Sequence, residues 1–276
     1  MSPVVLRRQP PVIERVLPQL RVEHFAGLPQ DGTRVAVVAQ FSKGPRVTPS
    51  LEELLRQLLD GGYHVILVSA SPTRLPLRLD PGLCARMTLL RKPNIGYDFG
   101  SWATALAWDR RIASVNNVIF TNDSLAGPFV PLAPILRGFE GSQADVYALT
   151  DNTQFGRHLQ SYFLGFRRGV LREAPLARFW DSIQHMDDKE RIVLRNEVGL
   201  SRLLRREAFA VEVAFPHVEV VNAWQNPTID GWARLLNLGF PFVKRELLRR
   251  PELVTDGARI PDVLREKFGV KIEEWT

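Results

Sequence analysis

Two continuous apolar runs, separated by an amphipathic helix, constrain the fold of this chain more than any other feature. The runs are Arg34–Phe41 (RVAVVAQF) and Tyr63–Ser69 (YHVILVS), and both are rich in β-branched residues. Between them, leucines recur at helical spacing from Leu51 to Leu59, which places them on one face. Strands that are apolar throughout are typical of parallel sheets whose faces are covered by helices. The sequence therefore predicts an α/β fold with a Rossmann-type, mostly parallel sheet flanked by helices.

Shorter segments continue this alternation of strands and helices. Strands are expected at Arg86–Leu90, Asn117–Thr121 and Asp145–Thr150, because each is a short apolar or β-branched run. Helices are expected at Ser101–Arg110 and Lys189–Glu207, where apolar residues follow helical spacing. The alternation favours a single large sheet.

The chain has 276 residues and contains no clean linker, so we expect one domain with flanking segments. Residues 1–33 are rich in proline and arginine and form either an ordered N-terminal arm or a loose tail. Residues 34–215 are expected to form the α/β domain. Residues 216–276 are expected to form a helical, basic C-terminal extension packed on the same domain.

Basic residues exceed acidic ones, and the formal net charge is +6. Arginine and lysine are concentrated in Arg202–Arg206 and Lys244–Arg250. Such clusters are usually solvated helix faces. No helix-turn-helix, zinc-finger or RNA-recognition motif accompanies them, so we expect no nucleic-acid partner. The functional alternative that the charge favours is peripheral contact with an anionic membrane.

Signals for compartment point to the cytoplasm. No apolar run approaches the length of about 18 residues that spans a bilayer, and no secretory signal precedes the first strand. The single cysteine, Cys84, excludes an internal disulfide and fits a reducing compartment. We therefore expect a cytoplasmic protein that contacts the inner face of the cell membrane.

Motifs of several common enzyme classes are absent. The sequence has no phosphate-binding loop of the P-loop type, no dinucleotide-binding glycine motif and no nucleophile elbow. The five histidines lack the spacing of zinc ligands. P-loop ATPases, dehydrogenases, serine hydrolases and zinc enzymes are therefore disfavoured.

Asn122-Asp123-Ser124 directly follows a predicted buried strand. Ligands of α/β proteins bind at the carboxyl ends of such strands, and the three side chains offer oxygen atoms. Hard cations such as Mg²⁺ take oxygen ligands, often one or two carboxylates together with substrate phosphates. Asp123 is thus the candidate metal ligand. An equally good interpretation is that the tripeptide only caps a turn.

The loop from Asn94 to Asp98 leads into a predicted helix. A helix N-terminus presents unpaired N–H groups, which suit a diphosphate, and Gly96 would let the backbone approach it closely. Asn94, Gly96 and Asp98 are therefore candidate diphosphate-binding residues. The simpler alternative is that Asp98 or Ser101 is an ordinary N-cap.

Glu197 is the candidate general base. It lies beside a stripe formed by Val193, Leu200 and Leu204 on the core-facing side of its predicted helix. Buried carboxylates are rare unless they are paired or functional, and burial raises their proton affinity. The alternative is a structural salt bridge to a neighbouring arginine or to the sheet.

The segment His158–Phe163 (HLQSYF) is the candidate for sugar or acceptor binding. His158 could hydrogen-bond a sugar or phosphate, Tyr162 could stack on a sugar ring, and Ser161 lies between them in the motif. A lone histidine between apolar residues is more often structural, and aromatic residues most often pack in the core.

Five motifs follow one another along the chain: Asn94-x-Gly96-Tyr97-Asp98-Phe99-Gly100-Ser101-Trp102, Asn122-Asp123-Ser124 with Gly127-Pro128, His158–Phe163, Asn196-Glu197, and Gly239-Phe240-Pro241-Phe242-Val243-Lys244. Taken together and in this order, they resemble the rhamnan synthesis protein F family over roughly residues 34–250. The family implies glycosyl transfer in bacterial surface-polysaccharide assembly, typically of L-rhamnose from a dTDP-sugar donor to a polysaccharide or lipid-linked acceptor.

The resemblance also implies a GT-A-like glycosyltransferase layout. The Asn94 loop and the Asp123 turn would then hold the donor diphosphate, with Mg²⁺ or Mn²⁺ at Asp123. Glu197 would deprotonate the acceptor and invert the anomeric centre. Asn122-Asp123-Ser124 carries one carboxylate where the GT-A Asp-x-Asp element has two, which puts metal dependence in doubt. The alternative is a non-catalytic module that binds nucleotide sugars or carbohydrate.

Overall fold

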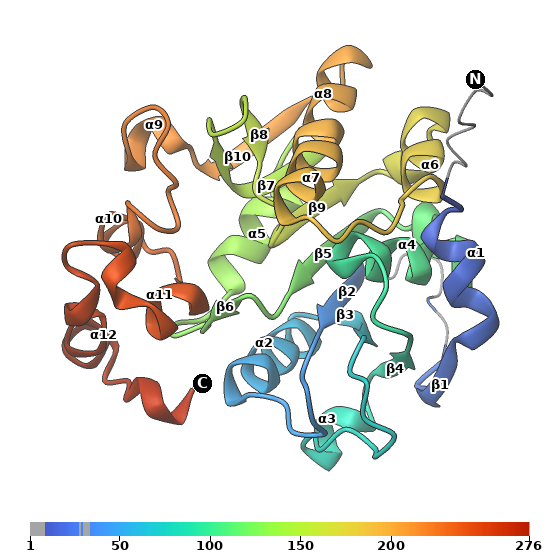
Figure 1. Cartoon of the computed structure of the whole chain (residues 1–276), viewed down its shortest axis with the longest axis horizontal. Coiled ribbons are helices and arrows are strands. Elements are labelled where there is room, and N and C mark those ends of the chain that lie inside the picture. Colours follow the sequence, from blue (N-terminus) through green and yellow to red (C-terminus); the bar gives the residue numbers. More distant parts are fainter. Residues whose placement is uncertain (1–8, 28, 30–33, 276) are drawn as a thin grey trace, which may run out of the picture.

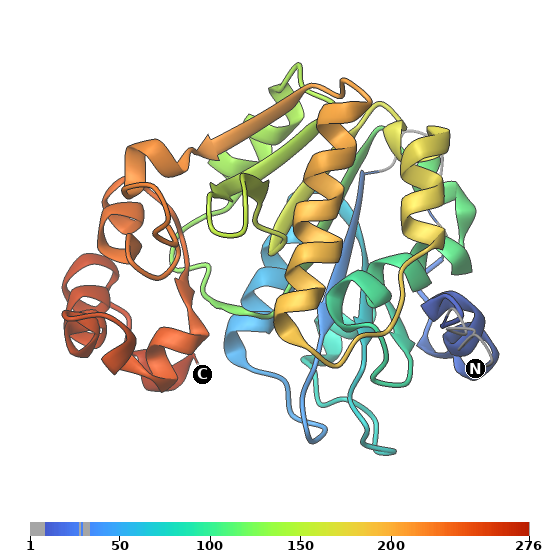
Figure 2. The same ribbon diagram turned by 45° about the horizontal axis from the view of Figure 1, so that its top comes forward.

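One mixed β-sheet with helices on both faces forms the centre of the protein (Figure 1 and Figure 2). The computed structural model describes residues 9–27, 29 and 34–275. The strand order is β1-β4-β3-β2-β5-β9-β7-β10, with the short strand β8 beside β7. The strands are β1 Arg21–His24, β2 Arg34–Gln40, β3 Tyr63–Ser69, β4 Thr88–Arg91, β5 Asn117–Asn122, β7 Val146–Asn152, β8 His158–Leu159, β9 Phe163–Arg167 and β10 Val211–Phe215.

Most strands of the sheet run in one direction. β4, β3, β2 and β5 are neighbours and pair in parallel. β9 pairs antiparallel with both β5 and β7, so β7 points the same way as β5, and β10 is parallel to β7. The predicted α/β class is therefore confirmed, and the arrangement is compatible with a GT-A-like Rossmann-type fold.

The helices connect these strands and cover the sheet. Thr48 caps the start of α2, because its hydroxyl accepts a hydrogen bond of 3.3 Å from the Leu51 N–H. The helices are α1 Val12–Val16, α2 Pro49–Asp60, α3 Pro81–Cys84, α4 Tyr97–Trp108, α5 Ala133–Gly141, α6 Ala174–Asp181, α7 Lys189–Ile192, α8 Val198–Arg206, α9 His217–Val220, α10 Trp232–Asn237, α11 Arg245–Arg249 and α12 Ile260–Phe268.

Two apolar layers pack on the two faces of the sheet. Helices α1, α4, α6 and α8 cover one face, and α2, α3 and α5 cover the other. On the first face, the Trp102 ring stacks on Phe120 with centroids 5.6 Å apart, and Trp180 meets Phe120 edge-on at 5.1 Å. Both tryptophans are therefore core residues, and neither is available to stack on a sugar.

Part of the predicted N-terminal arm packs on the domain. Helix α1 contacts α4, and strand β1 adds an antiparallel edge to the sheet beside β4. Val12 of α1 fills the space beside Gly96, where an added Cβ would lie 2.7 Å from the valine side chain. Residues 1–8 of the predicted arm lie outside the described residues.

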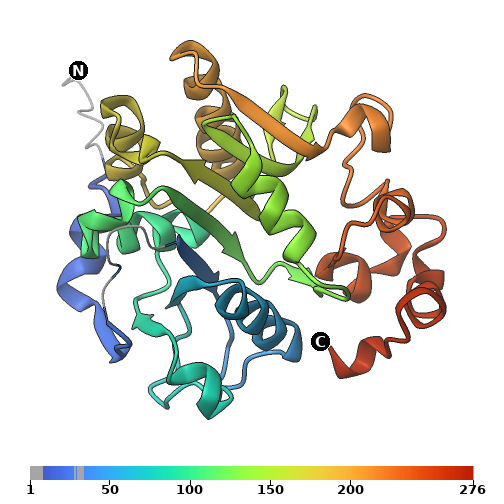
Figure 3. The same cartoon turned by 180° about the vertical axis from the view of Figure 1, so that it is seen from behind.

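The C-terminal extension is joined to the domain by a two-stranded sheet. Its strand β11 (Val243–Lys244) pairs antiparallel with β6 (Leu125–Ala126), which begins two residues after Asp123. The extension has its own apolar cluster, and it lies beside α2 and β6 (Figure 3). In the part of the chain that the structure describes, no helix is both long and apolar enough to cross a bilayer.

Two predicted helices differ in detail from the observed ones. Helix α4 begins at Tyr97, not at Ser101, because Gly96 and Tyr97 take left-handed conformations with φ of 85° and 52°. Neither Asp98 nor Ser101 is its N-cap, since Gly96 holds that position. The predicted helix Lys189–Glu207 is one run from α7 to α8, interrupted by a π-turn at Val193–Glu197.

Candidate functional site

Three carboxylates gather where β5 ends, where α4 begins and where α7 joins α8. Asp123 directly follows β5, Asp98 lies in the first turn of α4, and Glu197 ends the π-turn. The charges of Asp123 and Glu197 both raise the pKa of Asp98, so the three groups interact. The structure thus brings together the predicted donor-binding turn, the predicted loop and the predicted base.

Asp123 is held close to the end of strand β2. Its Oδ2 accepts a hydrogen bond of 3.2 Å from the Phe41 N–H, and its own N–H donates to the Ala39 carbonyl. Burial raises the pKa of Asp123 to about 6, although the Phe41 N–H and the nearby Arg245 and Arg249 oppose the shift. The carboxylate is thus desolvated but faces cationic side chains.

The neighbouring residue, Asn122, links Asp98 to the turn. Its Nδ2 donates to Asp98 Oδ2 at 2.7 Å, and its Oδ1 accepts from the Ser124 hydroxyl at 2.6 Å. Ser124 N–H also donates to Asn122 Oδ1, so the tripeptide does cap its own turn. Capping involves Asn122 and Ser124 only, because Asp123 faces Phe41 and the arginines.

The pKa of Asp98 is raised strongly, to about 7. Burial is the main cause, and the charges of Asp123 and Glu197 add to it. The hydrogen bond from Asn122 and the charge of Lys92 act in the opposite direction. Near neutral pH this carboxyl group is therefore divided between its protonated and ionised forms, and a bound cation would favour the ionised form.

The side chain of Lys92 holds the loop before α4 in place through hydrogen bonds to its backbone. The buried Lys92 ammonium donates to the Pro93 carbonyl at 3.0 Å and to the Ile95 carbonyl at 2.7 Å. Burial lowers the pKa of Lys92 to about 8, while the Asp98 charge opposes that shift. Sequence reasoning assigned no role to this lysine, which lies two residues before the loop motif.

The two loop residues predicted to bind the donor have different surroundings. Asn94 is exposed. The Gly96 N–H donates to His185 Nδ1 at 3.1 Å, and Val12 occupies the space beside its Cα. Packing and a positive φ therefore account for the glycine. Donor binding by Asn94 and Gly96 stays a prediction.

Glu197 contacts the predicted sugar-binding segment and not an arginine. Ser161 Oγ donates to Glu197 Oε1 at 2.9 Å, and His158 Nε2 lies 3.6 Å from Oε2. His158 Nδ1 lies 2.7 Å from the Gly156 carbonyl, which can only accept, so Nδ1 carries the proton and Nε2 faces Glu197. The segment thus positions the carboxylate.

The environment of Glu197 suits a proton acceptor. Burial raises its pKa, and the His158 charge, the Ser161 hydrogen bond and Lys244 oppose the shift. Its side chain keeps 20% of its surface exposed, so a proton can reach it. The π-turn that ends at this residue is a feature often found at functional sites.

Tyr162 does not lie in this centre. Its ring belongs to the apolar cluster on the α2 face of the sheet and meets Phe240 edge-on. Its hydroxyl hydrogen-bonds the Thr150 hydroxyl at 2.6 Å. The prediction that Tyr162 stacks on a sugar is therefore wrong for this structure, because its ring is buried in the core.

Cationic side chains from the C-terminal extension complete the centre. The pairing of β11 with β6 places Lys244 and Arg245 beside the Asp123 turn, and the Arg245 N–H donates to the Ser124 carbonyl at 3.2 Å. Burial lowers the pKa of Lys244, and the Glu197 charge opposes this. The prediction of a solvated face at Lys244–Arg250 is wrong for these two half-buried residues. Lys244 is the last residue of the fifth motif, and this position was the sequence signal that could have identified it as a site residue.

The residues fit a metal ion only if a ligand shares it. Within residues 9–27, 29 and 34–275, no group of three or more histidine, cysteine, aspartate or glutamate side chains could hold a metal. A Mg²⁺ ion that also binds phosphates needs only one or two carboxylates. Asp123 is the residue that would hold it.

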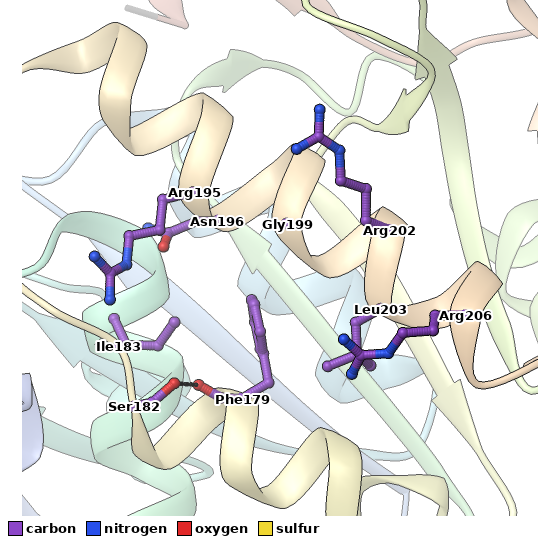
Figure 4. A pocket seen from close by; sticks show the side chains of 9 residues that line it. All are labelled: Phe179, Ser182, Ile183, Arg195, Asn196, Gly199, Arg202, Leu203 and Arg206. Carbon is purple, nitrogen blue, oxygen red and sulfur yellow. Dashed lines mark hydrogen bonds between the residues drawn. The ribbon is translucent and has the colours of Figure 1, made fainter.

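A second cationic feature lies on another side of the same helix (Figure 4). Whereas Glu197 faces His158 and Ser161, Arg195, Arg202 and Arg206 line a groove of about 300 Å³ beside α6. Phe179 and Leu203 contribute apolar surface to this groove. It is separate from the carboxylate centre.

Comparison with known proteins identifies relatives of the chain. A model of the rhamnan synthesis protein F family matches residues 84–267, a range that includes Asp98, Asp123 and Glu197. The virulence protein VirA of Vibrio anguillarum is 28% identical over 225 residues, covering 70% of this chain and 71% of that protein. The uncharacterized protein y4gN of Sinorhizobium fredii is 25% identical over 179 residues, covering 62% of this chain and 46% of that protein.

Proposed function

The chain belongs to the rhamnan synthesis protein F family, and from this premise we propose that it is an inverting glycosyltransferase of polysaccharide synthesis. It would move a sugar, L-rhamnose in our proposal, from a dTDP-sugar donor to a polysaccharide or lipid-linked acceptor. The observation that carries the proposal is the desolvated Glu197, positioned by Ser161 and His158 beside the Asp98–Asp123 centre.

In the proposed reaction, the donor diphosphate binds at the carboxyl edge of the sheet. Asp123, Asn122, Ser124, Asp98 and the Asn94–Gly96 loop form that edge of the site. Asn122 is held in place by Asp98 and Ser124, so its orientation is set before the donor binds. The leaving group gains negative charge in the transition state, and fixed positive groups stabilise it.

Positive charge has two sources in this proposal. A divalent cation, Mg²⁺ or Mn²⁺, held by Asp123 and the phosphates would supply Lewis-acid stabilisation of the leaving group. Lys244 and Arg245 contribute charge from the protein itself, since both lie beside the Asp123 turn. A cation at this position would offset the repulsion between the charges of Asp98 and Asp123, which contributes to the raised pKa of Asp98.

The proposed chemical step uses Glu197 as the general base. Glu197 takes the proton of an acceptor hydroxyl, whose oxygen attacks the anomeric carbon. The bond between that carbon and the diphosphate oxygen breaks, and its electron pair leaves with the diphosphate. Attack opposite the leaving group inverts the anomeric centre, and one carboxylate in the base role is sufficient.

Contact with an anionic membrane is a further part of this proposal. Arg195 and Arg202 of the groove beside α6 are exposed, and among the described residues neither forms an ion pair. Anionic lipid attracts such side chains. Sedimentation with anionic and with neutral vesicles tests the contact, and equal binding to both would contradict it.

The second candidate function is a non-catalytic module that binds nucleotide sugars. The single carboxylate of Asn122-Asp123-Ser124 favours it. A thermal-shift screen of nucleoside diphosphates and nucleotide sugars, with and without Mg²⁺ or Mn²⁺, tests what both functions share. We expect one nucleotide class to raise the melting temperature. No shift with any of them would contradict both functions.

A further inference from the structure

A cavity in the C-terminal extension is lined in part by Arg245, which also lies beside the Asp123 turn. It has a volume of about 680 Å³, within the range of small-molecule sites. Thr48, the N-cap of α2, lines it together with residues of the extension from Arg245 to Glu273. The extension and α2 lie side by side near the C-terminus (Figure 1 and Figure 3).

Two arginines give the cavity a cationic side. The Arg245 guanidinium is half-buried and fixed by hydrogen bonds to the Thr48 hydroxyl and the Leu125 carbonyl. Arg249, one helical turn later, is exposed and forms no ion pair with the described residues. One carboxylate, Glu273, also lines the cavity and is exposed. Both arginines act on Asp123, which shows that they lie near the centre.

The remaining wall is aliphatic. Leu247, Leu248, Ile260 and Ile272 are among its residues, together with prolines and an alanine. The lining includes no aromatic ring on which a nucleotide base could stack and no amide side chain that could hydrogen-bond to the edge of the base. Two arginines beside an aliphatic wall therefore match an anion that carries a hydrocarbon chain better than they match a nucleotide.

We propose that this cavity binds the phosphate-linked lipid end of the acceptor, with the phosphates on Arg245 and Arg249 and the hydrocarbon chain along the aliphatic wall. The proposal rests on the proposed transferase function, because only that function makes the bound lipid an acceptor. The cavity would hold the acceptor within reach of Glu197, while the arginines separate its negative charge from that of the donor.

Binding of farnesyl diphosphate to the full chain, measured by calorimetry in EDTA, tests this proposal. We expect it to bind at least about tenfold more tightly than inorganic pyrophosphate, because its chain buries apolar surface. Arg249→Ala should weaken farnesyl diphosphate binding about tenfold or more, since charged hydrogen bonds are lost. Arg195→Ala, in the groove beside α6, is the matched control and should leave it unchanged.

A second variant distinguishes the contribution of the hydrocarbon chain to binding from that of the phosphates. Ala258 is exposed at the cavity, so Ala258→Trp should obstruct the hydrocarbon chain and leave pyrophosphate binding intact. Equal affinity for pyrophosphate and farnesyl diphosphate would overturn the proposal. It would also be overturned if Arg249→Ala weakened the binding of dTDP but left the binding of farnesyl diphosphate unchanged. Farnesyl diphosphate binding without turnover of any nucleotide sugar would keep the cavity assignment and reject the transferase.

Discussion

The two sides of the carboxylate centre are both desolvated, but different groups compensate them. Asp123 and Asp98 face cations, namely Arg245, Arg249 and Lys92. Glu197 instead lies beside His158 and accepts a hydrogen bond from the Ser161 hydroxyl, with Lys244 as a further cationic neighbour. A carboxylate held beside arginines suits the binding of a charged ligand, whereas a buried carboxylate that faces a histidine and a hydroxyl suits proton transfer. We therefore propose donor binding for one side and base chemistry for the other.

The largest effect should come from the base side. Glu197→Gln keeps the size of the side chain and removes its basicity, so we expect kcat to fall by about 10²–10⁴-fold. Donor affinity should stay within about twofold, because the donor binds on the other side. Steady-state kinetics and calorimetry measure the two quantities. Glu190→Gln, exposed on α7, is the control, and full activity of Glu197→Gln would refute the assignment.

A smaller loss should follow on the donor side. Asp123→Asn removes the charge that would hold a cation, and we expect kcat/KM to fall by about tenfold or more, which is about 1.4 kcal/mol of transition-state binding. The variant should also lose any response to Mg²⁺ or Mn²⁺. A metal titration of both proteins measures this. An unchanged metal response would show that Asp123 is not the ligand.

The pH profile should respond to Ser161. Its hydrogen bond stabilises ionised Glu197 and opposes the pKa increase caused by burial. Ser161→Ala should therefore raise the pKa of Glu197 further, and the acidic limb of the pH profile should move to higher pH. Ser161→Thr retains a hydroxyl and should restore the limb. If the limb stays in place in Ser161→Ala, the base is another group.

The smallest expected effect concerns stability. The pKa of Asp98 rises to about 7 on folding, from its ordinary value of 3.8, so the folded state binds the proton more tightly. Its stability contribution is present at low pH and is lost as pH rises toward 7. Asp98→Asn cannot ionise, so we expect its Tm to exceed that of the wild type by about 2 °C or more at pH 8, and by less at pH 5. A gain that is larger at pH 5 would contradict the direction of this shift.

The parallel half of the fold was predictable because local patterns specify it. Strands β2 and β3 were located from continuous apolar runs, and helix α2 was located from the spacing of its leucines. The start of α4 was missed because the sequence does not show that Gly96 and Tyr97 adopt left-handed conformations. Local patterns predict elements well where the backbone is regular.

The site was only partly predictable because its second half depends on long-range contacts. Glu197 could be found as a polar residue beside an apolar stripe, but its π-turn leaves no sequence signal. Lys244 and Arg245 reach Asp123 through the pairing of β11 with β6, which joins segments far apart in the chain. Tyr162 was misassigned because its neighbour Ser161, and not Tyr162 itself, faces Glu197.

Turnover measured together with binding tests the central claim most directly. Wild-type protein would be incubated with a panel of dTDP- and UDP-sugars and with polysaccharide or lipid-linked acceptors. Nucleoside diphosphate release and donor affinity would be measured on the same preparation. We predict that at least one donor both binds and is converted to its nucleoside diphosphate, with product of inverted configuration. A donor that binds but yields no nucleoside diphosphate with any acceptor would contradict the account and favour a non-catalytic binding module.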